Sequence, residues 1–312
     1  MTDIAITDRS LADRPLPPAH LIEKHVRLAL DEDLGAGEDL TAALVPEGER
    51  SSAEVVAREE AVLCGCAWFE AVFRLLDPAI RVSWDIRDGQ RVAAGDRICR
   101  LVGSSRALLT GERTALNYLQ TLSGTATRAQ RYAEAVVGLP VRVLDTRKTL
   151  PGLRVQQKYA VACGGGHNHR QGLFDAILIK ENHIRAAGSI GTALQAARAL
   201  GRGVPIEIEV ESLDELDEAL TAGARHVLLD NFSLADLRQA VALNGARARL
   251  EASGGVSLQT IRAIAETGVD DVSVGDLTKD LRAIDLSMRI LDGRVEPVSP
   301  ASPPSNAPHR AG

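Results

Sequence analysis

Aromatic side chains are scarce in this chain: its 312 residues include two Trp, three Tyr and four Phe. So few aromatic rings leave little surface on which nucleic-acid bases could stack. The formal net charge of −6 also disfavours non-specific binding to a polyanion. No run approaches the roughly 18 consecutive apolar residues that indicate a membrane-spanning helix. We therefore expect neither nucleic acid nor a membrane as a partner.

Cysteine is also scarce, and the four in the chain are Cys64, Cys66, Cys99 and Cys163. Cys64 and Cys66 form a CxC pair, but no second pair follows at the spacing typical of a zinc site. The segment Met1–Leu21 holds three acids and no apolar stretch, unlike a secretory signal. We expect buried, reduced thiols in a cytoplasmic protein.

The overall composition is that of a soluble globular protein, with 45% hydrophobic and 25% charged residues. At roughly 150 residues per domain, the length indicates about two domains. Residues 1–18 are polar and contain three prolines, so we expect a flexible lead-in. Residues 296–312 are rich in Pro, Ser and Ala, so we expect a disordered tail.

Residues 19–130 mix two kinds of pattern. Apolar residues recur at helical spacing in some segments, and short extended runs bounded by turns lie between these segments. Helices are expected at 20–31 and 107–122, and strands at 53–58, 82–86 and 97–102. The mixture predicts an α+β domain with an antiparallel sheet.

Residues 131–279 alternate short apolar runs with helical segments, which predicts a parallel sheet buried on both faces. Strands are expected at 141–145, 176–180, 206–210, 226–230, 249–253 and 272–275, with helices at 190–200, 213–222, 234–243 and 258–267. The ends of the last five runs, from Lys180 to Gly275, follow one another at nearly even intervals. This regular spacing favours the βα units of a barrel over a doubly wound sheet.

Polar residues end most of these predicted strands. Because the active site of a βα barrel lies at the carboxyl ends of its strands, these side chains are expected at one mouth. They are Asp145, Lys180, Glu209, Asp230 and Ser253. Any one of them alone is also compatible with a loop or a helix cap.

Residues 145–185 form a basic segment in an acidic chain. Seven Lys and Arg and three acids give the segment a charge of +4, which leaves −10 for the rest of the chain. Arg offers a planar fork for a carboxylate or phosphate, and Lys offers a mobile point charge. We expect the segment to bind a small polyanion, with ordinary surface ion pairs as the alternative for each side chain.

Glycine-rich loops adjoin this segment. The three glycines at 164–166 precede His169 and Arg170 and allow a ligand to approach main-chain N–H groups. A metal pair of His167 and His169 is the alternative, although nothing nearby completes a zinc site. Further glycines follow the last two predicted strands, where barrels commonly hold a phosphate. The phosphate candidates are Ser253, Gly254, Gly255 and Gly275.

Glu209 and Asp230 are acids in a region expected to bind an anion. One explanation is Mg²⁺, which prefers one or two carboxylates together with substrate phosphates. The two carboxylates are equally suited to accept hydrogen bonds from sugar hydroxyls. A third role is to stabilise a cationic sugar carbon as it develops.

Together these motifs resemble the quinolinate phosphoribosyltransferases. The resemblance is strongest over the nearly ungapped segment 145–170 and extends over about residues 20–292. Shorter matching motifs lie at 38–41, 111–117, 178–183, 207–210, 229–231, 251–255 and 274–275.

The resemblance implies an α/β fold with two domains. An N-terminal α/β sandwich at 19–130, completed by a C-terminal helix at about 280–293, is joined to an incomplete α/β (TIM-like) barrel at 131–279. It implies a homodimer or homohexamer that uses Mg²⁺. It further implies that quinolinate and phosphoribosyl pyrophosphate give nicotinate mononucleotide, pyrophosphate and CO₂.

The resemblance also implies roles for individual residues. The quinolinate carboxylates would be bound by Arg147, His169, Arg170 and Lys180, with Arg113 lent by the partner subunit. Lys148 would lie between the two substrates, and Glu209 and Asp230 would lie near the ribose and the metal. The catalytic set is therefore Lys148, Glu209 and Asp230. Ser253, Gly254, Gly255 and Gly275 would form the phosphate loops.

The sequence departs from the family pattern at one place. Lys279-Asp280 stands where the family commonly has His-Ser, and this change affects the phosphate end of the site. The chain is also compatible with a related pyridine or pyrimidine phosphoribosyltransferase. An aldolase with Lys180 as its Schiff-base nucleophile and a non-catalytic anion-binding protein are two further possibilities.

Overall fold

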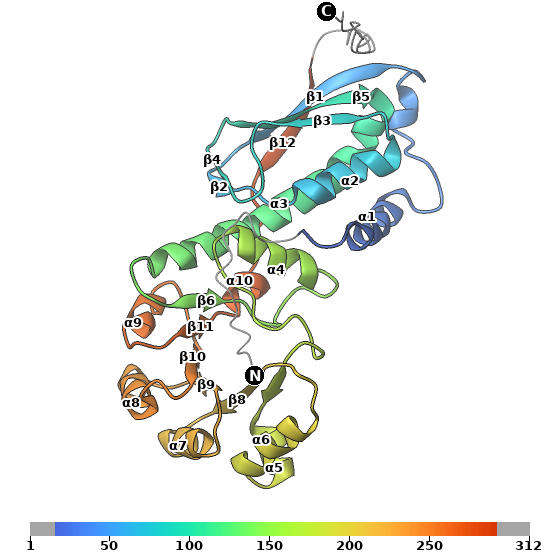
Figure 1. The fold of residues 1–312 in the computed structure, drawn as a ribbon. Helices are drawn as coiled ribbons and strands as arrows, with labels where there is room; N and C mark the ends of the chain where they lie inside the picture. Colours follow the sequence, from blue (N-terminus) through green and yellow to red (C-terminus); the bar gives the residue numbers. More distant parts are fainter. Residues whose placement is uncertain (1–15, 292–312) are drawn as a thin grey trace, which may run out of the picture.

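The computed structural model describes residues 16–291 and shows two domains connected by one long helix (Figure 1). The predicted tail at 296–312 and most of the predicted lead-in at 1–18 lie outside the described residues. An antiparallel sheet domain and a parallel α/β domain are present, so the predicted fold class is confirmed. The long helix, α3 (Ser105–Ala135), continues well past its predicted end at residue 122 and runs along both domains.

The N-terminal domain is a layer of helices on a four-stranded antiparallel sheet. The strand order is β12 (Leu286–Leu291), β1 (Arg50–Ala57), β5 (Arg97–Ser104) and β3 (Arg81–Trp84). A separate two-stranded antiparallel sheet pairs β2 (Ala61–Val62) with β4 (Arg91–Val92), and a 3₁₀ turn occupies Ala42–Leu44. The helices are α1 (Ala19–Leu34), α2 (Cys66–Leu76) and the first half of α3.

The predicted helix at about 280–293 is wrong, because this segment forms strand β12. Leu286 and Met288 are buried and alternate with Ser287 and Arg289, which is the two-residue repeat of a strand. The strand pairs antiparallel with β1, and Arg289 also bonds Glu54 across the pair. This segment therefore completes the N-terminal sheet as a strand.

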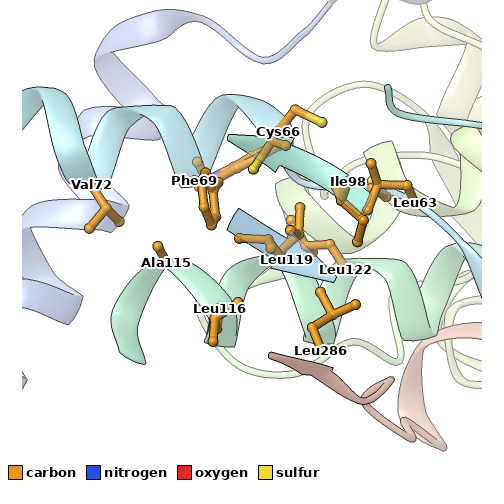
Figure 2. Packing of buried hydrophobic residues seen from close by; sticks show 14 of the residues in the cluster. Leu63, Cys66, Phe69, Val72, Ile98, Ala115, Leu116, Leu119, Leu122 and Leu286 are labelled. Atoms are coloured by element: carbon orange, nitrogen blue, oxygen red, sulfur yellow. The ribbon is translucent and has the colours of Figure 1, made fainter. Parts of the chain in front are cut away.

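The core of the N-terminal domain lies between the sheet and the helices α2 and α3. Figure 2 shows Phe69 of α2 meeting Leu119 and Leu122 of α3, with Leu286 of β12 on the other side. All four cysteines are buried, as predicted. Burial raises the pKa of the Cys64 thiol well above its usual value, so the thiolate is suppressed.

The C-terminal domain is an incomplete barrel of six parallel strands. Their order is β6 (Arg142–Leu144), β11 (Asp271–Ser273), β10 (Arg249–Ser253), β9 (His226–Asp230), β8 (Ile206–Val210) and β7 (Ile177–Ile179). The segment at His167 adds a single parallel bridge to Leu144 beside β6. Each strand lies close to its predicted position, because apolar runs and spacing define it locally.

Helices cover the outside of this sheet (Figure 1). They are α4 (Arg154–Cys163), α5 (Glu181–Ala187), α6 (Ile190–Ala199), α7 (Leu213–Thr221), α8 (Leu234–Asn244), α9 (Ile261–Ala265) and α10 (Asp276–Lys279). Helix α4 packs on α3 at Gly164, where an added Cβ would lie 2.1 Å from the Ala126 carbonyl oxygen. Within residues 16–291, no helix is long and apolar enough to cross a membrane.

The inner face of the barrel carries several charged residues, which corrects the expectation of strands buried by apolar residues on both faces. On β8, Ile208 and Val210 pack in the apolar core, whereas Glu207 and Glu209 alternate with them and face the interior. The inward positions of β10 and β11 include Glu251 and Asp271 in the same way. The barrel interior is therefore available for charged chemistry.

Candidate active site

The carboxyl ends of four neighbouring strands bring the predicted polar residues to one mouth of the barrel. Lys180 directly follows β7, and Glu209 is the fourth residue of β8. Asp230 and Ser253 end β9 and β10 and stand opposite each other in the parallel pairing. The residues next to them in sequence pack in the apolar core between the sheet and the outer helices. Because side chains alternate along a strand, these polar side chains point inward.

Lys180 and Glu209 form an ion pair across the ends of β7 and β8. The Lys180 side chain is 47% exposed, whereas that of Glu209 is 13% exposed. The backbone N–H of Lys180 donates to His183 Nδ1 at 3.0 Å, which fixes the start of α5. The ammonium group is thus held at the mouth but open to solvent, where an anionic ligand can reach it.

Asp145 is fully buried and anchors the loop that follows β6. It accepts hydrogen bonds from Lys158 Nζ, from Asn168 Nδ2 at 2.6 Å and from the backbone N–H of His169 at 2.9 Å. Burial raises the pKa of Asp145 and lowers the pKa of Lys158, while each charge opposes the shift of the other. Asp145 therefore holds the segment that carries His169 and Arg170.

Arg147 and Lys148 lie in the loop after β6. Among the residues that the structure describes, the buried Nε of Arg147 has no hydrogen-bond partner. A buried guanidinium nitrogen without a partner is costly, so this atom is suited to receive an anionic ligand. Lys148 passes beside Gly275, where an added Cβ would lie 3.1 Å from Lys148 Cδ.

His169 and Arg170 face the interior below the mouth. His169 Nε2 lies 2.9 Å from Glu207 Oε2 and 3.5 Å from Glu251 Oε2. Burial and the neighbouring Arg147 lower the pKa of Arg170, while Glu207 is among the acids that oppose this shift. Arg170 therefore feels both the Arg147 cation and the Glu207 acid.

A cavity of about 220 Å³ opens at the opposite end of the strands. Its lining includes His169, Arg170 and the first residues of four strands, which are Arg142, His226, Arg249 and Asp271. Asp271 accepts hydrogen bonds from both Arg142 and Arg249, so one carboxylate pairs with both guanidinium groups. His169 and Arg170 thus reach further into the barrel than the other predicted ligands.

The predicted phosphate loop after β10 packs against the loop that follows β9. Gly254 has φ of +97°, and an added Cβ would lie 2.1 Å from the Asn231 side-chain oxygen. The Asn231 backbone N–H donates to the Ser253 carbonyl at 2.9 Å. Only glycine fits this close approach, and Gly255 (φ +58°) continues the loop in the left-handed region.

The Lys279-Asp280 departure changes the ion pairs at this end. Arg128 of α3 contacts both Asp276 and Asp280, the latter at 2.7 Å. The Tyr132 hydroxyl donates to Asp276 at 2.7 Å. Asp280 is therefore engaged by Arg128, while Lys279 stays exposed beside the loop after β11.

Arg113 is the predicted site residue that the fold keeps apart from the others. It is exposed on α3 and borders a cavity of about 330 Å³ with Glu32, Asp33 and Asn117. Leu153, in the loop before α4, also lines this cavity, but the predicted barrel ligands do not. Within one chain, Arg113 does not meet the mouth of the barrel.

Two groups within the described residues hold three possible metal ligands each. The first is Cys64, Asp88 and Cys163, so Cys64 groups with Cys163 instead of Cys66. Asp88 already accepts two backbone N–H groups of the α2 terminus and the Tyr159 hydroxyl. The second group is His169, Glu207 and Glu251, whereas the backbone of His167 pairs with β6.

Sequence reasoning missed Glu207 and Glu251. Burial raises the pKa of the Glu251 carboxyl, and the adjacent Glu207 carboxylate raises it further. The signal for Glu207 was present in the alternating sequence Ile-Glu-Ile-Glu-Val of β8, which turns both glutamates to one face.

Comparisons with known proteins agree over most of the chain. Family models described as quinolinate phosphoribosyl transferase, N-terminal and C-terminal domain, match residues 39–123 and 125–289. A probable nicotinate-nucleotide pyrophosphorylase (carboxylating) of Bacillus subtilis is 42% identical over 260 residues, which cover 83% of this chain and 90% of that protein. The nicotinate-nucleotide pyrophosphorylase (carboxylating) of Mycobacterium leprae is 42% identical over 272 residues, which cover 84% of this chain and 95% of that protein.

Solved structures show the same likeness. The nicotinate-nucleotide pyrophosphorylase from Francisella tularensis superposes with a TM-score of 0.84 at 45% identity. The match covers 88% of this chain and 98% of that one.

Proposed function

The chain belongs to the quinolinate phosphoribosyltransferase family, and we propose that it transfers the phosphoribosyl group of phosphoribosyl pyrophosphate to quinolinate. The products are nicotinate mononucleotide, pyrophosphate and CO₂, a step of NAD biosynthesis. The observation that best supports this reaction is the set of cations at and below the barrel mouth. Among them, the buried Nε of Arg147 has no partner within residues 16–291.

Quinolinate is a planar dianion with two adjacent carboxylates. Arg147 lies close enough to Arg170, which is below the mouth, to lower the pKa of that guanidinium, and Lys180 stands at the mouth. Such repelling cations are stabilised when a dianion lies between them. His169 lies next to Arg170 and accepts the Arg170 backbone N–H at Nδ1.

The second substrate carries a 5-phosphate and a pyrophosphate. Backbone N–H groups at Gly254, Gly255 and Gly275, together with the Ser253 hydroxyl, suit phosphate oxygens. Lys148, which lies against Gly275, would bind between the phosphates and quinolinate.

The chemistry needs positioned charge more than an acid or base. The pyridine nitrogen attacks C1 of the ribose, the C1–O bond breaks, and pyrophosphate leaves with the bonding electrons. Carboxylates at Glu209 and Asp230 would stabilise the cationic sugar carbon at the transition state. The new pyridinium then accepts the electrons of the C2–carboxylate bond as CO₂ leaves, and a proton from solvent replaces it.

Mg²⁺ fits the two acids at the mouth. Glu209 and Asp230 offer only oxygen donors from the ends of adjacent strands, and Mg²⁺ is commonly held by one or two carboxylates and substrate phosphates. When bound, the ion would neutralise charge on the pyrophosphate leaving group. Glu209 and Asp230 would be the residues that hold it.

Arg113 supports an oligomeric enzyme. It is exposed and stands apart from the barrel mouth of its own chain, so a second copy is needed to bring it to a site. We infer a homodimer or homohexamer in which Arg113 completes the quinolinate pocket of the partner. The four free, buried thiols favour a cytoplasmic enzyme.

The direct test is an assay with quinolinate, phosphoribosyl pyrophosphate and Mg²⁺, with nicotinate replacing quinolinate as the control. We expect nicotinate mononucleotide from quinolinate and a reaction at least about a hundredfold slower with nicotinate, because nicotinate lacks one carboxylate of the dianion. Equal turnover of nicotinate would identify a related phosphoribosyltransferase instead. Trapping of Lys180 by borohydride with a carbonyl substrate would identify an aldolase.

A further inference from the structure

Two interior carboxylates have no place in the reaction proposed above. Glu207 lies on β8 one layer below Glu209, and Glu251 lies on β10. Their side chains are 12% and 6% exposed. Both approach His169 Nε2, at 2.9 Å from Glu207 and 3.5 Å from Glu251, so the His169 ring lies between two strands that are not adjacent in the sheet.

The hydrogen-bond pattern fixes which nitrogen of His169 carries the ring hydrogen. Nδ1 accepts the backbone N–H of Arg170 at 2.7 Å. A nitrogen that accepts an N–H cannot carry a hydrogen itself, so the hydrogen is on Nε2 and is donated to Glu207. A metal ion held by His169, Glu207 and Glu251 would require the Nε2 lone pair, which this tautomer lacks. His169 and Glu207 therefore form a hydrogen-bonded pair in preference to a metal site, with Glu251 3.5 Å from the same nitrogen.

The main chain of His169 is held as firmly as its ring. Its N–H donates to the buried Asp145, and its carbonyl accepts from Lys158 Nζ at 3.0 Å. The next residue, Arg170, is fixed by its own N–H on the His169 ring and by a bond from its guanidinium to the Ala176 carbonyl at 3.3 Å. The N–H and C=O of His169 and the N–H of Arg170 thus all have hydrogen-bond partners. These bonds link Arg170 through the His169 ring to Glu207.

The charges around Arg170 explain why an acid stands beside His169. Arg170 lies near Arg147, and two neighbouring guanidinium groups repel each other. Glu207 is an acid that faces Arg170 from the interior and counters this repulsion. β8 therefore presents two inward carboxylates, two residues apart, of which Glu209 contacts Lys180 and Glu207 contacts His169.

We propose that Glu207 and Glu251 are positioning residues that act through His169 to hold Arg170 where it binds a carboxylate of the pyridine substrate. His169 then acts on the substrate through Arg170, since both of its ring nitrogens bond within the protein. The inference rests on the proposed function, because it names Arg170 as a quinolinate ligand.

The first experiment compares steady-state constants of Glu207→Ala and Glu207→Gln with the wild type. Glu207→Ala should raise KM for quinolinate about tenfold and leave KM for phosphoribosyl pyrophosphate within about twofold, because a buried bond to one ligand is lost. Glu207→Gln keeps an acceptor for Nε2–H and should recover most of the affinity. Glu218→Ala, an exposed glutamate on α7, is the matched control and should change neither constant.

Unchanged quinolinate KM in a folded Glu207→Ala protein, or equal increases in both KM values, would overturn the proposal. If Glu207→Ala does not fold, Glu251→Ala provides the second variant and should show the same selective loss. If the wild type uses nicotinate and not quinolinate, the proposed function is refuted. That result is distinct from the KM results of the variants, which test the positioning role alone.

The second experiment reads the hydrogen on His169 directly and does not depend on activity. Long-range ¹H–¹⁵N correlation spectra of the wild type, with His169 assigned from a His169→Gln sample, should show the hydrogen on Nε2 and an unprotonated Nδ1. Glu207→Ala should shift the Nε2 resonance. A ring hydrogen on Nδ1 in the wild type would contradict the hydrogen bonds from Arg170 to His169 and from His169 to Glu207, even if the enzyme turns over quinolinate.

Discussion

Lys180, at the end of β7, forms an ion pair with Glu209 of the adjacent strand β8. The pair places a cation and an acid at one mouth, so a bound dianion has to draw Lys180 away from Glu209. We expect Lys180→Ala to raise KM for quinolinate at least about tenfold, from the loss of a charge-assisted bond of about 1.5 kcal/mol. The measurement is initial rate against quinolinate concentration. Arg202→Ala, on an exposed loop, is the control, and equal KM values in the two variants would refute this role.

Arg147 should be a strong quinolinate ligand because its Nε is buried and unpaired among the described residues. Arg147→Ala should weaken quinolinate binding by about 1–3 kcal/mol, or about 5- to 150-fold in Kd. Titration calorimetry with quinolinate measures this directly. Arg185→Ala, on α5, removes an exposed guanidinium from the same basic segment and should leave Kd unchanged. A normal Kd for Arg147→Ala would exclude Arg147 from the pocket.

Arg113 and Lys148 test whether the site is shared between subunits. Each single alanine variant should have low activity, since each removes a cation from every site. When the two variants are unfolded together and refolded, mixed dimers contain one site with both wild-type residues. We expect up to about a quarter of wild-type activity at equal mixing, because half the dimers are mixed and one of their two sites is intact. No recovery above the separate variants would show that Arg113 and Lys148 serve the same chain.

The two acids at the mouth predict a dependence on divalent cations. Removal of Mg²⁺ with a chelator should abolish nicotinate mononucleotide formation, and added Mg²⁺ should restore it. Asp230→Asn should raise the Mg²⁺ concentration needed for half-maximal rate, whereas Asp217→Asn, exposed on α7, should not. Full activity in the presence of the chelator would argue against the metal role of Glu209 and Asp230.

Because Glu251 is a buried acid, we expect the thermal stability of the protein to depend on pH. Its pKa is raised in the folded state, by burial first and then by Glu207, so the protonated form is favoured on folding. The associated stability is present below the unfolded-state pKa and is lost as pH rises through the folded-state value. The Tm of Glu251→Gln relative to wild type should therefore increase by a few degrees between about pH 5 and pH 8.5. Glu218→Gln should show a flat difference, and a flat difference for Glu251→Gln would contradict the buried-acid assignment.

The parallel strands could be predicted from sequence because each is a short apolar run with a polar end. The even spacing from Lys180 to Gly275 then indicated the barrel. Strand β12 was mistaken for a helix because the family resemblance was taken to imply a helix there, and its partner β1 lies in the first quarter of the chain. Local sequence carries no information on such a distant pairing.

The mouth of the site could be predicted for the same reason, since strand ends define it. The interior could not, because Glu207, Glu251 and His169 come from three distant segments and meet only when the sheet curves. The isolation of Arg113 is also a tertiary property: its place on α3 was predictable, but its distance from the mouth depends on how α3 joins the two domains.

The proposed mechanism requires that transfer of the sugar to quinolinate precedes loss of CO₂. The most direct measurement follows ¹⁴CO₂ from quinolinate labelled in its 2-carboxylate, together with pyrophosphate. We predict release of the two products in equal amounts and no ¹⁴CO₂ when phosphoribosyl pyrophosphate is omitted. Release of ¹⁴CO₂ without phosphoribosyl pyrophosphate, or in excess of pyrophosphate, would contradict this order of events.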